Sequence, residues 1–138
     1  MAEDTRGFTL IELVIVMILL GLLAIVAFPK FIDLTGVAKA EATRASLGSL
    51  RSTLYLRYAD NVTAGNPSFP SSITTADFAT NQLPINKCTG NSGIAVVASA
   101  PGGTTEDATN GFWYIVSNGQ AGAYANSTIS HCANTSNF

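Results

Sequence analysis

The dominant pattern in the chain is an uninterrupted apolar stretch near its N-terminus. It covers residues 8–28, FTLIELVIVMILLGLLAIVAF, and contains a single charged residue, Glu12. At a rise of about 1.5 Å per residue, a helix of this length spans about 30 Å, the thickness of a bilayer core. The apolar core of a secretory signal is shorter, about 7–15 residues. We therefore predict a membrane-spanning helix, with a buried core helix as the alternative.

After Pro29 the pattern changes to that of an amphipathic helix over residues 30–60. Apolar positions recur at spacings of three, four and seven, which places them on one stripe of a helix. The stripe consists of Val37, Ala40, Leu47, Leu50, Leu54 and Tyr58. We expect it to pack on a C-terminal head. The two helical segments are predicted to form one rod broken or kinked at Pro29, which lacks a backbone N–H.

The C-terminal segment, residues 61–138, alternates between turn residues and short apolar runs. Residues 94–98 and 111–116 are predicted strands, the second rich in aromatic and β-branched residues. Ser117-Asn118-Gly119-Gln120 is a hairpin turn signal, and residues 121–125 form the expected return strand. The predicted fold class is therefore α+β, with a long N-terminal helix packed on a small antiparallel sheet of three or four strands.

Composition and charge exclude several classes of function. The chain has 138 residues and a formal net charge of −2 at pH 7, so we expect no nucleic acid partner, which would need a basic surface. Only 12% of the residues are charged, about half of what an average soluble domain carries. One histidine and two cysteines leave no His-rich or multi-cysteine metal centre. His131 beside Cys132 lacks a visible orienting group, so we expect no enzyme and no cofactor.

Glu12 is unusual because a carboxylate in the hydrocarbon region costs a few kcal/mol. It lies only four residues into the apolar stretch, where its side chain can reach the interface. A tolerated interfacial acid is one interpretation. The other is that Glu12 pairs with a cationic group of another chain, because an ionisable group within a membrane is by default a functional hypothesis.

The residues around Glu12 indicate that partner. Gly7-Phe8-Thr9-Leu10-Ile11-Glu12, followed by the long apolar helix, resembles the processing site of type IV prepilins and related secretion pseudopilins. The resemblance implies cleavage between Gly7 and Phe8, removal of residues 1–7 as a leader, and N-methylation of Phe8. Glu12 and Pro29 then match the glutamate and proline that this family uses in assembly. One departure is that the leader carries two acids and one base.

Electrostatics agrees with this resemblance. Cleavage would create an ammonium group on Phe8, and the Glu12 carboxylate of one subunit could pair with the Phe8 ammonium of the next. The resulting division is a leader (1–7), a transmembrane and filament-core helix (8–29), an amphipathic helix (30–60) and a β-rich head with a disulfide loop (61–138). Residues 29–34, PKFIDL, also resemble mannose-sensitive haemagglutinin-type pilins.

Two further pairs of residues are candidates for a role in the head. Cys88 and Cys132 are the two cysteines, and cysteines of exported proteins commonly pair. Type IV pilins usually close a C-terminal loop in this way, so the resemblance favours a disulfide over two free thiols. Glu106 and Asp107, in a glycine-rich loop, are weak calcium candidates, because pseudopilins carry a calcium loop there; a solvated turn is the alternative.

The resemblance implies a structural subunit of a type IV pilus that assembles with copies of itself and with other pilins. The implied partners are a prepilin peptidase and methyltransferase, the inner-membrane assembly platform, and the membrane before assembly. Afterwards the subunit would lie in a surface pilus or a periplasmic fibre. One alternative is a pseudopilin of a type II secretion system. The second is a fibre-tip binding subunit, which should expose aromatic residues. Phe112, Trp113 and Tyr114 are the candidates, although strand alternation is expected to bury at least some of them.

Overall fold

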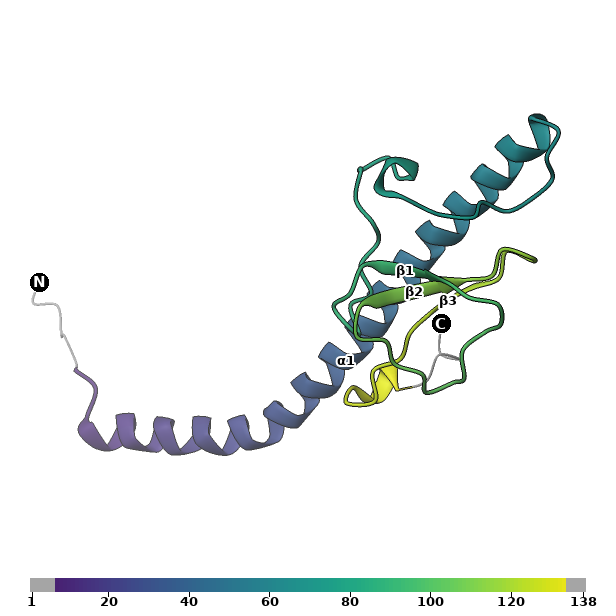
Figure 1. Ribbon diagram of the computed structural model, residues 1–138. Helices are drawn as coiled ribbons and strands as arrows, with labels where there is room; N and C mark the ends of the chain where they lie inside the picture. Colours follow the sequence, from purple (N-terminus) through teal and green to yellow (C-terminus); the bar gives the residue numbers. More distant parts are fainter. Residues whose placement is uncertain (1–6, 134–138) are drawn as a thin grey trace, which may run out of the picture. The chain divides into compact units, whose positions relative to one another are not determined.

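The structure, a computed structural model, describes residues 7–133, apart from the side chain of Asp33. The chain divides after Leu34 into two compact units, which we call the anchor unit (residues 7–34) and the head unit (residues 35–133). The predicted α+β class is confirmed. The elements, in chain order, are α1 (Leu10–Thr63), η1 (Thr75–Asp77), β1 (Gly93–Val96), β2 (Asn110–Tyr114), β3 (Ala121–Ala123) and η2 (Ser130–Cys132) (Figure 1).

Helix α1 is continuous from Leu10 to Thr63 and includes Pro29. The helix is therefore not interrupted at Pro29, whereas the alternative expectation, a kink there, stays a prediction. The helix also runs three residues beyond the predicted end. It stops where Gly65 adopts a positive φ of 81°, with hydrogen bonds from Gly65 N to Val62 O (3.0 Å) and from Asn66 N to Asn61 O (2.8 Å). This is the Schellman arrangement that ends many helices.

The predicted stripe on α1 forms the helical side of the head core, with one correction. Ala40, Leu47, Leu50 and Leu54 are buried, whereas Val37 is 36% exposed. Gly36 takes the place of Val37 in the packed face, because a Cβ at Gly36 would lie 3.4 Å from His131 Cδ2. The C-terminal segment approaches α1 at a position without a side chain, and Val37 points elsewhere on the helix.

The sheet has the order β1-β2-β3 and is mixed rather than antiparallel. Strands β2 and β3 are antiparallel, as predicted, but β1 and β2 are parallel. The prediction failed for β1 because residues 97–109 are long enough to carry the chain back to the end at which β1 began, which a parallel pair requires. The predicted hairpin turn is confirmed by hydrogen bonds from Gly119 N to Ile115 O (2.9 Å) and from Ile115 N to Gln120 O (2.8 Å).

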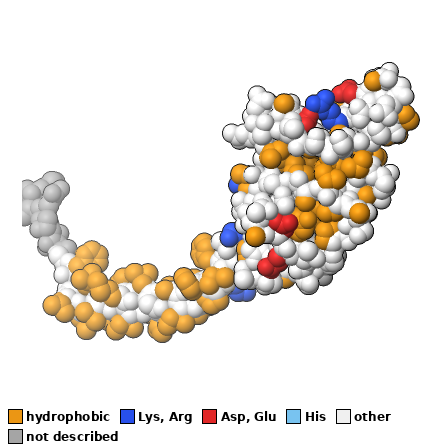
Figure 2. Space-filling view, in the orientation of Figure 1, with side chains coloured by type: hydrophobic (Ala, Val, Ile, Leu, Met, Phe, Trp, Pro, Cys, Tyr) orange, Lys and Arg blue, Asp and Glu red, His pale blue; other side chains and the backbone are white. Residues whose placement is uncertain are grey.

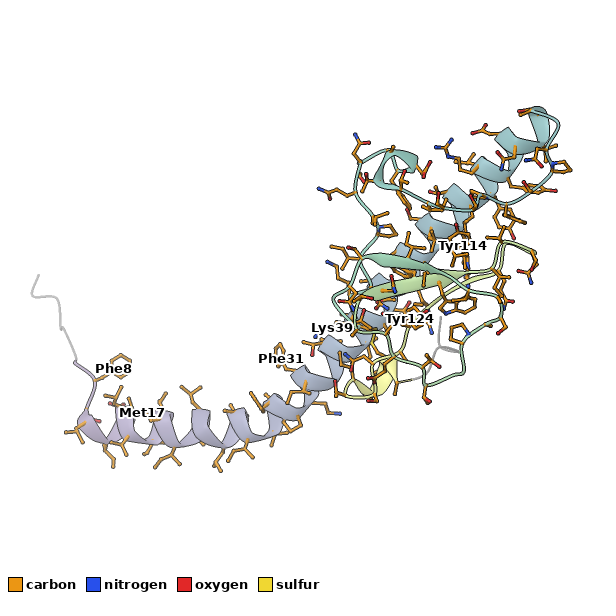
Figure 3. The ribbon with its side chains drawn as sticks, in the orientation of Figure 1. Phe8, Met17, Phe31, Lys39, Tyr114 and Tyr124 are labelled. Atoms are coloured by element: carbon orange, nitrogen blue, oxygen red, sulfur yellow. A yellow bond between two sulfur atoms is a disulfide. The ribbon has the colours of Figure 1, made fainter. Side chains whose placement is uncertain are left out.

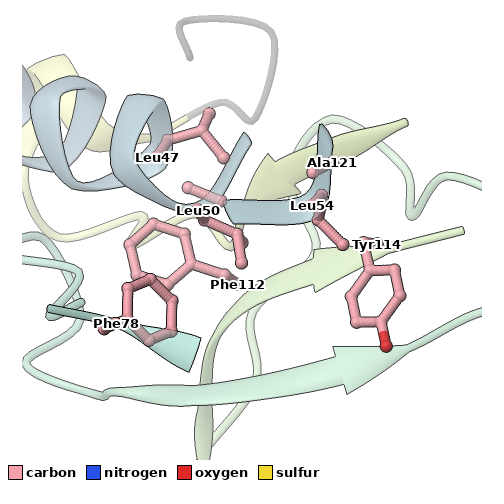
Figure 4. Close-up of a cluster of buried hydrophobic side chains, with 8 residues drawn as sticks. Leu47, Leu50, Leu54, Phe78, Phe112, Tyr114 and Ala121 are labelled. Carbon is pink, nitrogen blue, oxygen red and sulfur yellow. The ribbon is translucent and has the colours of Figure 1, made fainter. Parts of the chain in front are cut away.

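Alternation along β2 divides the head into two apolar clusters. Phe112 and Tyr114 pack with Leu47, Leu50 and Leu54 of α1 in the main core (Figure 4). Trp113, which lies between them on β2, and Ile115, the residue after β2, belong to a second cluster together with Tyr124. Because successive side chains of a strand point to opposite faces, β2 contributes to both clusters.

Candidate assembly site

The apolar side chains of the anchor unit are exposed along its whole length. Phe8 is 93% exposed, Met17 65% and Phe31 67% (Figure 3). Even the most covered of the large apolar side chains in this unit, Val14, is 40% exposed. Helix α1 thus contains a stretch long and apolar enough to cross a membrane, and the described part of the chain does not cover it. Such a surface needs lipid or other protein around it, because exposing it to water is costly.

The first turn of α1 is closed by a reciprocal pair of side chains. Thr9 donates to Glu12 Oε2 through its backbone N–H (2.8 Å) and through Oγ1 (2.8 Å). In return, the Glu12 backbone N–H donates to Thr9 Oγ1 (3.3 Å). This is a capping box, which supplies partners to backbone N–H groups that a helix end leaves open. Glu12 thus has a local structural role that the sequence analysis did not consider, although the Thr-x-x-Glu signal was present.

The predicted processing position precedes this cap. A Cβ on Gly7 would meet no atom within 4 Å, and Phe8 is almost fully exposed. The backbone on both sides of the predicted cleavage point is therefore uncovered by the described part of the chain. Residues 1–6 of the predicted leader lie outside the described residues. Pro29, the other predicted assembly residue, lies within α1.

The predicted disulfide is present in the head. Cys88 and Cys132 are joined, with their Cα atoms 5.8 Å apart, and both are buried with Ala40 of α1. Thr43 Oγ1 lies 3.4 Å from Cys88 Sγ and accepts a hydrogen bond from the Cys88 backbone N–H (3.3 Å). The disulfide therefore joins the C-terminal segment to the Cys88 segment, and both cysteines pack on α1 at Ala40.

A fully buried asparagine, which the sequence analysis missed, organises the backbone around this disulfide. Asn86 Nδ2 donates to Gly111 O (2.8 Å) and to Tyr124 O (3.0 Å). Asn86 Oδ1 accepts from the backbone N–H groups of Cys88 (2.9 Å) and Thr89 (3.3 Å). One side chain thus joins the cysteine turn to β2 and to the segment after β3. Only its place two residues before a cysteine could have drawn attention to it.

The two weak calcium candidates are engaged in local hydrogen bonds. Glu106 Oε1 accepts from the Ser127 backbone N–H (2.6 Å), and hydrogen bonding to Ser127 lowers the pKa of Glu106. The Asn110 and Thr109 backbone N–H groups donate to Asp107 and lower its pKa to about 2. Among the described residues, no group of three or more His, Cys, Asp or Glu is placed to hold a metal ion.

The aromatic residues considered for binding, and the cysteine considered as a nucleophile, are not accessible for these roles in the head unit. Phe112, Trp113 and Tyr114 are all buried, at 0%, 5% and 0% exposure, so they do not form the exposed aromatic surface that a tip-binding subunit would need. His131 is exposed, but the neighbouring Cys132 is in the disulfide and has no free thiol.

Comparisons with known proteins match part of the chain. Residues 4–28 match the family model described as the prokaryotic N-terminal methylation motif. The chain is also 45% identical over 47 residues to the "Type IV narrow pilus major component PilA5" of Thermus thermophilus. This similarity covers 34% of the chain and 40% of the relative, so the chain spans less than half the length of the relative it matches. No solved structure matches the chain significantly.

The matched motif overlaps the start of helix α1. The chain combines this motif with a long N-terminal helix and a small mixed sheet. The chain is thus similar to type IV pilins over part of its length, and the named relative is the major component of a type IV narrow pilus.

Proposed function

We propose that the protein is a structural subunit of a type IV pilus. In this proposal a prepilin peptidase cleaves between Gly7 and Phe8, Phe8 is N-methylated, and the subunit assembles through α1 into a surface fibre. Residues 1–7 are the leader, residues 8–29 form the membrane and filament-core helix, and residues 30–60 and 61–138 provide the helix and sheet of the head.

The observation that carries this proposal is the exposed apolar surface of the anchor unit. Transfer of one Leu, Ile, Val or Phe side chain from water to an apolar environment is worth about 1.5–3 kcal/mol, so many such side chains hold the anchor in the membrane. Lipid tails are as apolar as these side chains. Moving the anchor from lipid into a bundle of identical helices therefore depends on close packing and on polar contacts.

Glu12 is the polar contact that we assign to this transfer. Its capping bonds come from Thr9 of the same chain, and both oxygens of a carboxylate can accept further bonds. A charged donor from a second subunit can thus approach Glu12 without breaking the cap. The ammonium of a processed Phe8 is such a donor, and pairing the two charges limits the cost of either one in a region of low dielectric.

The proposed partners follow from this route. The peptidase and methyltransferase act on the membrane-inserted precursor, an inner-membrane platform receives the processed subunit, and further copies or other pilins surround it in the fibre. The chemistry is structural rather than enzymatic. The Cys88–Cys132 disulfide supports a pilus subunit over a short secretion fibre whose subunits carry a calcium loop in the head.

The test compares Glu12→Ala with Glu12→Gln in cells that assemble the protein. Glutamine can still accept the two Thr9 hydrogen bonds but carries no charge, whereas alanine removes both the cap and the charge. We expect both variants to be processed and to accumulate in the membrane with few fibres. Normal fibre yield from Glu12→Gln would refute the charge pairing, because it would show that the cap alone suffices.

Processing has its own measurement. Mass spectrometry of the mature wild-type chain should show an N-terminus at methylated Phe8. A chain that keeps Met1, or a wild-type protein that never enters a fibre, would overturn the proposed function as a whole.

A further inference from the structure

The head unit carries charges that no opposite charge in the described part of the chain neutralises. Its ion pairs join Arg44 to Glu41 and Arg57 to Asp77. The described residues include no ion-pair partner for Lys39 or Lys87, and both lysines are exposed. Glu106 and Asp107 accept hydrogen bonds from N–H groups and a hydroxyl but form no ion pair there. Lys39, Lys87, Glu106 and Asp107 thus have no ion-pair partner among the described residues.

One of these two lysines borders a groove of the head. Lys87 lines a groove of about 410 Å³ between α1 and the segment 78–87. Lys39 lies one helical turn before Thr43, and Thr43 contacts Cys88, the neighbour of Lys87. The other lining residues are uncharged: Ala45, Ser46, Ser49, Phe78, Thr80, Gln82, Leu83, Pro84 and Ile85. Ile85 is 41% exposed, so the groove combines an apolar wall with a basic end.

The acids belong to a different element, the loop 97–109 between β1 and β2. Hydrogen bonds from Thr105 N to Gly102 O (3.0 Å) and from Ala125 N to Thr105 O (3.0 Å) hold this loop in shape. Residues 98–105, ASAPGGTT, have small side chains and no charge, and most of them are exposed. On the face drawn in Figure 2, acidic and basic side chains of the head unit are few and lie among uncharged ones. The loop is thus slim, preorganised and acidic at one end.

An open fibre needs contacts of this kind. A helical polymer of identical subunits is built from heterologous contacts, in which one patch of a subunit meets a different patch of the next. We propose that loop 98–107 of one copy docks in the Lys87 groove of a neighbouring copy, with Glu106 facing Lys87. This inference rests on the proposed function and adds a specific contact between heads to the contact between anchors.

The contact should be sensitive to charge and to salt. Exposed ion pairs contribute modestly to the free energy of association. Reversing one charge should therefore raise the fraction of unassembled subunit by about two- to five-fold. Salt screens charges over about 8–10 Å at physiological ionic strength, so added NaCl should also raise the fraction of unassembled wild-type subunit.

The experiment measures the yield of sheared fibres from cells that make the full-length protein. The variants are Lys87→Glu, Glu106→Lys and the double exchange, with Asp60→Lys as the matched control. Asp60 is an exposed acid near the end of α1 that lines neither the groove nor the loop. Each single reversal in the pair should lower the yield, the double exchange should restore it, and Asp60→Lys combined with Lys87→Glu should not.

Unchanged yields in both single variants, or no recovery in the double exchange, would overturn the contact. Wild-type fibres would still form in that case, so the proposed function would stand. If a reversal prevents the Cys88–Cys132 disulfide from forming, Lys87→Gln and Glu106→Gln replace it. Each neutral variant should flatten the dependence of fibre yield on NaCl, and an unchanged slope would refute the proposal.

Discussion

Asn86→Ala should destabilise the head far more than a surface change, because Asn86 satisfies backbone groups in three segments. Two of these groups keep another partner: Gly111 O still accepts from Tyr124 N, and Cys88 N still donates to Thr43 Oγ1. Tyr124 O and Thr89 N lose their side-chain partner. A buried polar group without a partner costs about 1–3 kcal/mol. We expect a total loss of about 2–4 kcal/mol, since the Thr89 site is only half-buried.

Asn86→Asp tests the hydrogen bonds of this side chain while its size and shape stay the same. The carboxylate has the same size but cannot donate, and it would face the carbonyl oxygens of Gly111 and Tyr124. Burial and these oxygens should raise the pKa of the introduced carboxyl above its ordinary value. A carboxyl group whose pKa is raised in the folded state destabilises that state as pH rises. The variant should therefore lose stability between about pH 4 and about pH 7 relative to the wild type.

The assay is urea unfolding of the full-length protein in detergent, followed by fluorescence of Trp113. This is the one tryptophan in the chain, and it is 5% exposed in the head. Asn91→Ala is the matched control, because Asn91 makes one side-chain bond, to Asp107 O (3.2 Å), at a half-buried site. We expect about 1 kcal/mol or less for this control. A loss below about 1 kcal/mol for Asn86→Ala, with the disulfide intact, would refute the reasoning.

Two further predictions concern the stability of the head. Replacing both cysteines by serine should lower its unfolding free energy by about 4 kcal/mol in the chain-entropy treatment, measured by the same Trp113 fluorescence; an unchanged urea midpoint would contradict this. The Thr74 backbone N–H, aided by Arg57, lowers the pKa of Asp77. A carboxyl group whose pKa is lowered by folding stabilises the folded state above the pKa it has in the unfolded chain, and this contribution is lost on acidification. Asp77→Asn should therefore flatten the fall of the melting temperature below about pH 4. Equal acid sensitivity in the variant and the wild type would argue against a role for this carboxylate.

Local sequence signals account for much of the fold. The apolar stretch, the Thr9–Glu12 cap and the turn at Asn118-Gly119 each depend on residues within a few positions of one another. Hydrogen bonds between near neighbours form the cap and the turn, and the periodicity of a single helix forms the stripe on α1. These features were predictable from the sequence because the interacting residues are close along the chain.

The tertiary structure decided how distant segments meet. The parallel direction of β1, the burial of Gly36 instead of Val37 and the central place of Asn86 all depend on contacts between residues far apart in sequence. Periodicity specifies which side of an element is apolar. Which partner that side meets depends on loop closure and packing across the whole chain, and no local pattern encodes these.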